Sequence, residues 1–294
     1  MPPRFAYPAA AVLLAAGPVV ALMVPFRAPA LRAITADVVV VGTVTAVEKE
    51  PIEVSPARGA EGKVAFRLAV VKVDQPLAGA DTLTHLKVGF VPRPPAAGRP
   101  GAGPAVLPPR RFGTPELKVG DQFLFFLTRH HEGTFYTMPF TSPPLDPKGE
   151  GGKAELEEAK KALAVVADPK TSLAAAKADD RAFAAAVLVT KYRTYPETGG
   201  EVAEVPLPAD ESRLLLKGLA DGDWKQGNRF GAVSPFAAFN QLGLTPQDGW
   251  APPQPPRPVP GQQVDYATLA KEAFVTWLDG PGKDYRVKRV VAKK

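Results

Sequence analysis

The chain of 294 residues contains no cysteine. Disulfide bonds, thiolate metal sites and cysteine nucleophiles are therefore excluded. Small secreted domains often depend on disulfides, but a chain of this length buries enough apolar surface to fold without them. The missing cysteines therefore restrict the chemistry of the protein and leave its fold open.

Motifs of several enzyme classes are absent as well. The sequence has no serine in G-x-S-x-G, no H-E-x-x-H, no G-x-x-x-x-G-K and no G-x-G-x-x-G after a strand. Asp221-Gly222-Asp223 begins like a calcium-binding loop, but Trp224 and Lys225 stand where the next oxygen ligand is required. We therefore expect no catalytic motif, no metal site and no cofactor.

The first 30 residues have the features of an export leader. Arg4 precedes an apolar stretch, Ala9–Phe26, and Ala28-Pro29-Ala30 then gives the small-x-small pattern that signal peptidases cut. The stretch of 18 residues is longer than the usual leader core of about 7–15 residues and close to the minimum for a membrane span. Pro18 and Pro25 are tolerated better in a leader than in a membrane helix.

We predict export, with cleavage after Ala30 and a periplasmic or extracellular protein as the result. The alternative is an uncleaved anchor, in which case the leader is the only contact with the membrane. A cytoplasmic protein is the third alternative. No later stretch is long and apolar enough to cross a bilayer.

Charge is mildly basic and unevenly placed. The formal net charge is +6, and loss of Arg4 and Arg27 with the leader lowers it to +4, too little to indicate nucleic-acid binding. The tail from Lys283 to Lys294 holds six cations against Asp284. These cations indicate either a solvated end or contact with an anionic surface; they are Lys283, Arg286, Lys288, Arg289, Lys293 and Lys294.

From residue 36 to residue 140 the pattern is that of β-strands. Asp37–Val47 carries valines on both sides, so both of its faces should be covered. Gly42 predicts a sharp bend of the kind found at barrel corners. The apolar phase of the next strand changes after Val70, which predicts a β-bulge there.

Three further strands complete this half. They are predicted around Leu86–Phe90, Phe123–Leu127 and Thr134–Met138. Five short, curved strands suit a small closed barrel, because closure removes exposed edges. The stretch Pro92–Pro115 has eight prolines in 24 residues and is predicted to be a surface loop.

Three segments together carry a resemblance to a known family: ADVVVVGTVTAV (36–47), FRLAVVKVDQPLAG (66–79) and LKVGDQFLFFLT (117–128). In strand order, mid-strand glycine and the VGD turn, they resemble the tissue-inhibitor-of-metalloprotease or netrin-like branch of OB-fold domains. The resemblance implies an OB-like barrel. Inhibition of metalloproteases does not carry over, because the animal inhibitors use an N-terminal cysteine that this chain lacks.

Residues 153–294 indicate an α-helical domain, for which no family resemblance is found. Helices are predicted at Ala154–Ala167, after Asp179 or Asp180, after Asp210, and at Pro235–Leu242. A proline-rich connector, 252–261, precedes an amphipathic stripe that starts at Tyr266. Tyr285–Val291 is predicted to be a short strand or an extended tail. The fold class is therefore α+β, a small five-stranded OB-like β-barrel followed by an α-helical domain.

Only one cluster offers weak candidates for a metal site. His130, His131 and Glu132 lie together in the predicted turn before the last strand. Adjacent histidines point apart and rarely bind one ion, so a solvated turn is the simpler interpretation. The three tryptophans are interpreted as packing residues.

The sequence favours an exported, non-enzymatic interaction protein of the cell envelope. Its expected partner is an envelope protein or an anionic surface, and not a nucleic acid, since the strand aromatics sit in inward-facing patterns. The alternative is a secreted hydrolase or metal-dependent enzyme whose site forms only in three dimensions.

Overall fold

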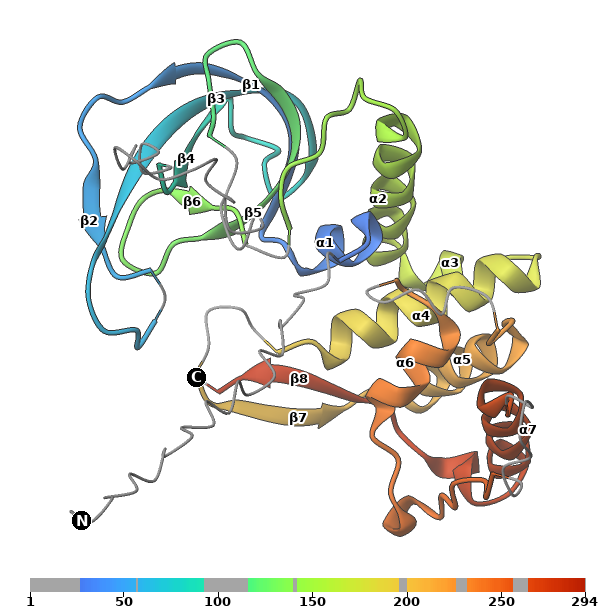
Figure 1. Ribbon diagram of the computed structural model, residues 1–294. Coiled ribbons are helices and arrows are strands. Elements are labelled where there is room, and N and C mark those ends of the chain that lie inside the picture. Colours follow the sequence, from blue (N-terminus) through green and yellow to red (C-terminus); the bar gives the residue numbers. More distant parts are fainter. Residues whose placement is uncertain are drawn as a thin grey trace, which may run out of the picture.

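The computed structural model describes residues 27–56, 58–92, 116–139, 142–195, 200–225, 232–255 and 264–293. A curled β-sheet and a group of helices lie side by side, with a short helix, α1 (Pro29–Thr35), between them (Figure 1). The predicted α+β class is confirmed. Residues 1–26 of the predicted leader, residues 93–115 of the proline-rich loop and residues 256–261 of the connector lie outside the described residues.

The sheet has six strands in the order β1-β5-β6-β4-β3-β2, with an additional pairing of β1 to β3. The strands are β1 (Val38–Val47), β2 (Ile52–Val54), β3 (Val64–Ala78), β4 (His85–Phe90), β5 (Gln122–Arg129) and β6 (Tyr136–Thr137).

The structure differs from the predicted closed barrel of five strands, because it has six strands and the sheet is not closed into a barrel. β2 was not predicted, and the fifth predicted strand, Thr134–Met138, shrinks to the two residues of β6. β6 pairs with β4 in parallel and with β5 antiparallel over two residues each, so the sheet does not close through a regular ladder. Pro139, two residues after the end of β6, has no N–H to extend the ladder.

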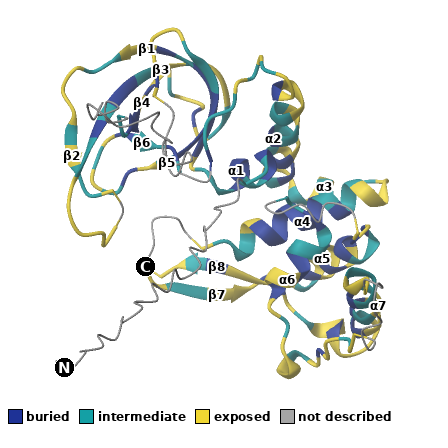
Figure 2. Ribbon diagram, viewed as in Figure 1, coloured by how far each residue is buried: buried dark blue, intermediate teal, exposed yellow. Residues whose placement is uncertain are grey.

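β1 is buried on both faces, as its sequence predicts. Val38, Val40 and Val44 pack inside the curled sheet. Val39 and Val41 point to the other side, into a cluster that includes Leu124 and Phe126 of β5, Ala33 of α1 and Ala159 of α2 (Gly152–Ala167). Figure 2 shows these buried positions running along the strand. The outer face of β1 is thus where the helices attach to the sheet.

Gly42 of β1 lies against β3 at a register shift of the β1–β3 ladder. A Cβ atom there would lie 2.6 Å from Cγ1 of Val71 and 2.8 Å from the carbonyl oxygen of Lys72, so only glycine fits. The β1–β3 register shifts next to Gly42 and again around Thr45. The predicted bulge at Val70 is therefore in the wrong strand, since the extra residue is Thr45 in β1.

The physical reason is that β3 changes partners along its length. Phe66 and Leu68 pack with Phe135 in one small cluster, while Ala69 and Val71 pack inside the sheet. The two apolar sets of β3 serve two different cores, and the ladder of β3 with β4 runs without a shift at Val70. The extra residues of β3 lie further along the strand, at Asp74 and Leu77 in its ladder with β1.

α1 was not predicted, because Pro29 and Ala30 were assigned to the leader and the β-rich domain was predicted to begin at residue 36. Ala30 and Ile34 are buried in the main cluster of the helical part, and Ala33 is buried in the cluster under β1. The Nζ of Lys191 donates a hydrogen bond to the carbonyl oxygen of Ile34 at 2.5 Å. One short helix therefore contributes side chains to both halves of the protein.

The helical part holds the remaining elements. They are α2, α3 (Pro169–Leu173), α4 (Ala178–Arg193), α5 (Ala209–Asp221), α6 (Pro235–Leu242), η1 (Pro246–Asp248), α7 (Tyr266–Asp279) and η2 (Pro281–Asp284), with a two-stranded sheet of β7 (Val202–Pro206) and β8 (Lys288–Ala292). β7 was not predicted, and β8 falls at the predicted short strand. The second half is therefore mostly, and not wholly, helical.

α4 is the central helix, as its apolar sequence predicts, with all residues from Ala184 to Thr190 buried. Its predicted cap is wrong by two or three residues: the N-cap is Lys177, and Asp179 and Asp180 lie in the first turn. Carboxylates there still interact favourably with the helix dipole. Asp210 has the same position in α5, whose N-cap is Pro208.

Aromatic rings hold α6, α7 and the chain between them together. Trp224 packs on Phe239 and Phe274, and Trp250 packs edge to face on Phe239 and Trp277. All three tryptophans are less than 9% exposed, which agrees with their interpretation as packing residues. Among the described residues, no helix has both the length and the apolarity to cross a bilayer.

Two N-terminal deletions test the role of α1. Removal of residues 1–26 leaves α1 whole, whereas removal of residues 1–30 deletes Ala30 and two of the three carbonyl groups that Arg32 binds, those of Arg27 and Ala28. We expect the shorter protein to be less stable by about 2 kcal/mol, the scale of a hydrogen bond to a charged group. Urea unfolding followed by tryptophan fluorescence measures the difference, and equal midpoints would contradict the structural role of α1.

Candidate functional site

An open groove lies in the helical part between the start of α4, the end of α5 and one side of α7. It has a volume of about 650 Å³. The residues that line it are Asp179, Asp221, Gly222, Asp223, Trp224, Lys225, Thr268, Lys271, Glu272, Val275 and Thr276. We call it the α4/α5/α7 groove.

One wall of the groove is held rigidly. Trp224 is 1% exposed, and its indole N–H donates to the carbonyl oxygen of Leu219 at 2.8 Å. The Nζ of Lys271 donates to the carbonyl oxygen of Gly222 at 2.7 Å, which ties α7 to the end of α5. A groove with one fixed wall loses less conformational entropy when it binds a partner.

Ion pairs occupy several of the charged groups at the groove. Arg181 donates from Nε and Nη2 to Oδ2 of Asp221 at 3.0 and 2.7 Å. Lys225 pairs with Asp265 at 2.8 Å, and hydrogen bonds from Lys225 and Thr268 lower the pKa of Asp265 to about 2. Asp265 thereby also caps α7.

Three exposed carboxylates remain along the groove, those of Asp179, Asp223 and Glu272. The two threonine hydroxyls of the lining already donate, that of Thr268 to Asp265 and that of Thr276 to the carbonyl oxygen of Glu272. The lining contains no histidine, serine or cysteine. The arrangement can attract a cation, but it does not pair a nucleophile with a base.

The sequence did not predict this groove, because its residues come from three separate elements. The single local signal was Asp221-Gly222-Asp223, which was considered as a calcium loop. Among the described residues, no three side chains are placed to hold a metal ion.

The weak candidates His130, His131 and Glu132 lie together at the end of β5. His130 is 5% exposed, and its ring stacks on Phe135 with centroids 4.5 Å apart. Its Nε2 lies 3.0 Å from the carbonyl oxygen of Ser55, and its Nδ1 accepts from the backbone N–H of Glu132 at 3.2 Å. Both ring nitrogens therefore serve the backbone, and His130 carries its proton on Nε2.

Glu132 and His131 make further contacts between the end of β5 and the chain after β2. Oε2 of Glu132 accepts from the backbone N–H of Ser55 at 3.1 Å, and Oε1 lies 3.6 Å from Nε2 of His131. The three residues fasten the chain after β2 to the end of β5. A metal ion could bind His130 only after one of these backbone bonds broke.

The buried His130 predicts acid sensitivity. Burial lowers the pKa of His130 below the ordinary value of 6.5, so below about pH 6.5 the unfolded chain binds a proton more readily than the fold does. The stabilisation is complete above that pH and is lost as the pH falls through the pKa of folded His130.

The variant His130→Phe tests this behaviour against His85→Gln, a change at an exposed position of β4. We expect His130→Phe to be less stable than the unchanged protein at pH 8. We also expect its stability to fall less between pH 7 and pH 5 than that of the unchanged protein. Melting temperatures across that range measure it. An unchanged slope in His130→Phe would contradict the assignment.

The cations of the predicted anionic-surface contact lie at and around β8. Lys288 pairs with Glu204 at 3.6 Å, and Lys293 pairs with Glu201 at 3.1 Å. The guanidinium of Arg289 lies 5.9 Å from the ring centre of Tyr192. Arg286 donates to the carbonyl oxygen of Leu207 at 3.3 Å, Lys283 is exposed in η2, and Lys294 lies outside the described residues. Contact with an anionic surface stays a prediction.

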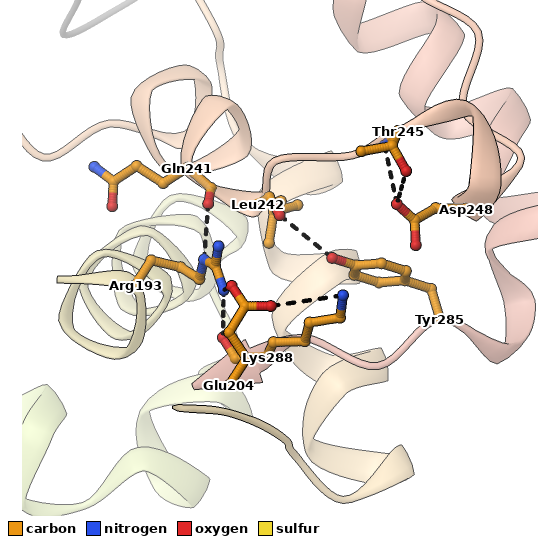
Figure 3. A network of polar contacts seen from close by, with 8 residues as sticks. All are labelled: Arg193, Glu204, Gln241, Leu242, Thr245, Asp248, Tyr285 and Lys288. Carbon is orange, nitrogen blue, oxygen red and sulfur yellow. Dashed lines mark hydrogen bonds and ion pairs between the residues drawn. The ribbon is translucent and has the colours of Figure 1, made fainter. Parts of the chain in front are cut away.

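A polar network joins this β-ribbon to the helices (Figure 3). Arg193 of α4 donates to Oε1 of Glu204 at 2.7 Å and to the carbonyl oxygen of Gln241 at 2.9 Å. Tyr285 donates to the carbonyl oxygen of Leu242 at 3.4 Å, and burial raises the pKa of Tyr285 to about 12. The network is structural, since its groups bind one another and the backbone.

We expect Arg193→Ala to destabilise the protein by about 2 kcal/mol, because the side chain is 15% exposed and makes charged hydrogen bonds to two elements. Arg213→Ala is the matched control. Arg213 is 72% exposed and pairs with an exposed Asp210, so it should cost less than about 0.5 kcal/mol. Chemical denaturation compares the two, and equal losses would contradict the role of Arg193.

No protein-family model matches this chain, and no curated protein matches it.

Proposed function

We propose that the protein is an exported, non-enzymatic binding protein of the cell envelope that engages its partner through the α4/α5/α7 groove. The observation that carries this proposal is the chemistry of the groove, a hollow of about 650 Å³ lined by exposed carboxylates and by the exposed Val275. A hollow of this size holds a short peptide segment or a small ligand.

The charges favour a cationic partner. Asp179, Asp223 and Glu272 are exposed along the groove, whereas Lys225 and Lys271 are already engaged by Asp265 and by a backbone carbonyl. Val275 is 40% exposed beside them and offers apolar contact. A segment of a second envelope protein that combines lysine or arginine with apolar side chains fits this surface.

We also propose that the curled sheet has an OB-like fold of the tissue-inhibitor-of-metalloprotease or netrin-like kind, without regular closure at β6. The strand order β1-β5-β6-β4-β3, with the further pairing of β1 to β3, supports this proposal. Inhibition of metalloproteases is not part of the proposal, since the chain has no cysteine to bind a protease zinc.

Capture from the envelope fraction tests the binding role. The exported protein with a C-terminal tag is recovered after mild crosslinking, and its partners are identified by mass spectrometry. We expect the double variant Asp223→Lys with Glu272→Lys to lose at least about tenfold in recovery, since two charges are reversed at a partner contact.

Asp210→Lys is the matched control, because Asp210 is fully exposed on α5 and lies outside the groove. It should recover the same partners as the unchanged protein. Equal recovery by the groove variant would contradict binding at the groove. Zinc or manganese bound in a one-to-one ratio in the purified protein would contradict the non-enzymatic function and favour a metal-dependent enzyme.

A further inference from the structure

The predicted leader cleavage site falls inside the folded protein. A cut after Ala30 separates the second and third residues of α1, which begins at Pro29. Ala30 is 0% exposed in the core of the helical part, and Ala33, three residues on, is 2% exposed in the cluster under β1. Figure 1 shows α1 between the sheet and the helices, so the cut lies at the junction of the two halves.

Polar contacts bind the same residues into the fold. The backbone N–H of Arg32 donates to the carbonyl oxygen of Ala28 at 3.0 Å, and its Nε donates to the carbonyl oxygen of Arg27 at 2.5 Å. A second guanidinium nitrogen donates to Pro143 at 3.0 Å. Arg32 is 6% exposed, so water replaces none of these acceptors easily.

A cut after Ala30 would remove two of the three acceptors of Arg32. It would leave a buried guanidinium partly unsatisfied and would place a new ammonium group of Leu31 at the positive end of a helix dipole. The backbone N–H of Ala30, which donates to Glu158 of α2 at 3.4 Å, would also be lost. The fold is therefore more stable when residues 27–30 remain on the chain.

No other cleavage pattern separates the leader from the fold. Between Leu22 and Ala30 the sequence has one small-x-small pattern, Ala28-Pro29-Ala30. Any such pattern further upstream lies within the apolar stretch Ala9–Phe26 and would divide it. If neither the pattern at 28–30 nor a pattern inside the stretch, such as Ala15-Ala16-Gly17, is used, the apolar stretch stays attached whole.

We infer that Ala9–Phe26 is retained as a membrane anchor and that the folded protein sits directly against a lipid bilayer. Only Arg27 and Ala28 stand between the apolar stretch and α1, so no linker separates the fold from the membrane surface. A stretch of 18 apolar residues reaches the length needed to span, and Arg27 suits the headgroup region beside it. This inference rests on the proposed export.

The test uses the full chain with a C-terminal tag in a bacterial host. Membranes are washed at alkaline pH, the protein is recovered from pellet and supernatant, and its intact mass is measured. Protease added to spheroplasts reports on which side of the membrane the fold lies. We expect the full-length mass, in the pellet, with the fold accessible to protease.

A variant with Ala-Ser-Ala inserted between Phe26 and Arg27 provides the matched comparison, because it places a cleavable pattern ahead of α1. We expect this variant to move to the supernatant as a product that starts at Arg27. An unchanged chain that starts at Leu31 in the supernatant would overturn the inference while leaving export intact. A fold that is protected from protease would show that the proposed export itself is wrong, and the inference would fail with it.

Discussion

The burial of β1 on both of its faces is the constraint on which the rest of the structure depends. A strand with valine on each side cannot leave either side in water, because each exposed valine forfeits about 1.5 kcal/mol or more of burial energy. The inner face is covered by the curl of the sheet itself, through pairing with β3 and β5. The outer face is covered by α1 and α2, which brings the helical half against the sheet.

Cationic side chains fix the joints that this packing creates. Arg32, Lys191 and Arg193 each donate to a backbone carbonyl of a different element, and Arg181 donates both to the turn before α4 and to Asp221 at the end of α5. The hydrogen bonds of these groups stabilise the fold. The carboxylates of the α4/α5/α7 groove differ, because they are exposed on a hollow surface, and they give the proposed binding function its location.

Long periodic segments were predictable, and short or discontinuous ones were not. The spacing of apolar residues located β1, β5, α4 and α7, because each buries a whole face and repeats its pattern over several turns or strand pairs. β2 has three residues, too few for a period to show, and the five residues of β7, VAEVP, do not alternate between apolar and polar side chains. α1 was missed because its alanines continue the composition of the leader, and its burial depends on partners more than 90 residues away, at Leu124 and Ala159.

The sequence by itself determined what kinds of side chain are present and which segments must be buried. It excluded thiol chemistry, established the α+β class, and required two covered faces for β1. Tertiary structure alone decided that His130 serves the backbone, that the tail cations meet Glu201 and Glu204, and that Asp179, Asp223 and Glu272 share one groove. The reason is that these contacts join residues far apart in the chain, and a local pattern carries no information about which distant partner a side chain meets.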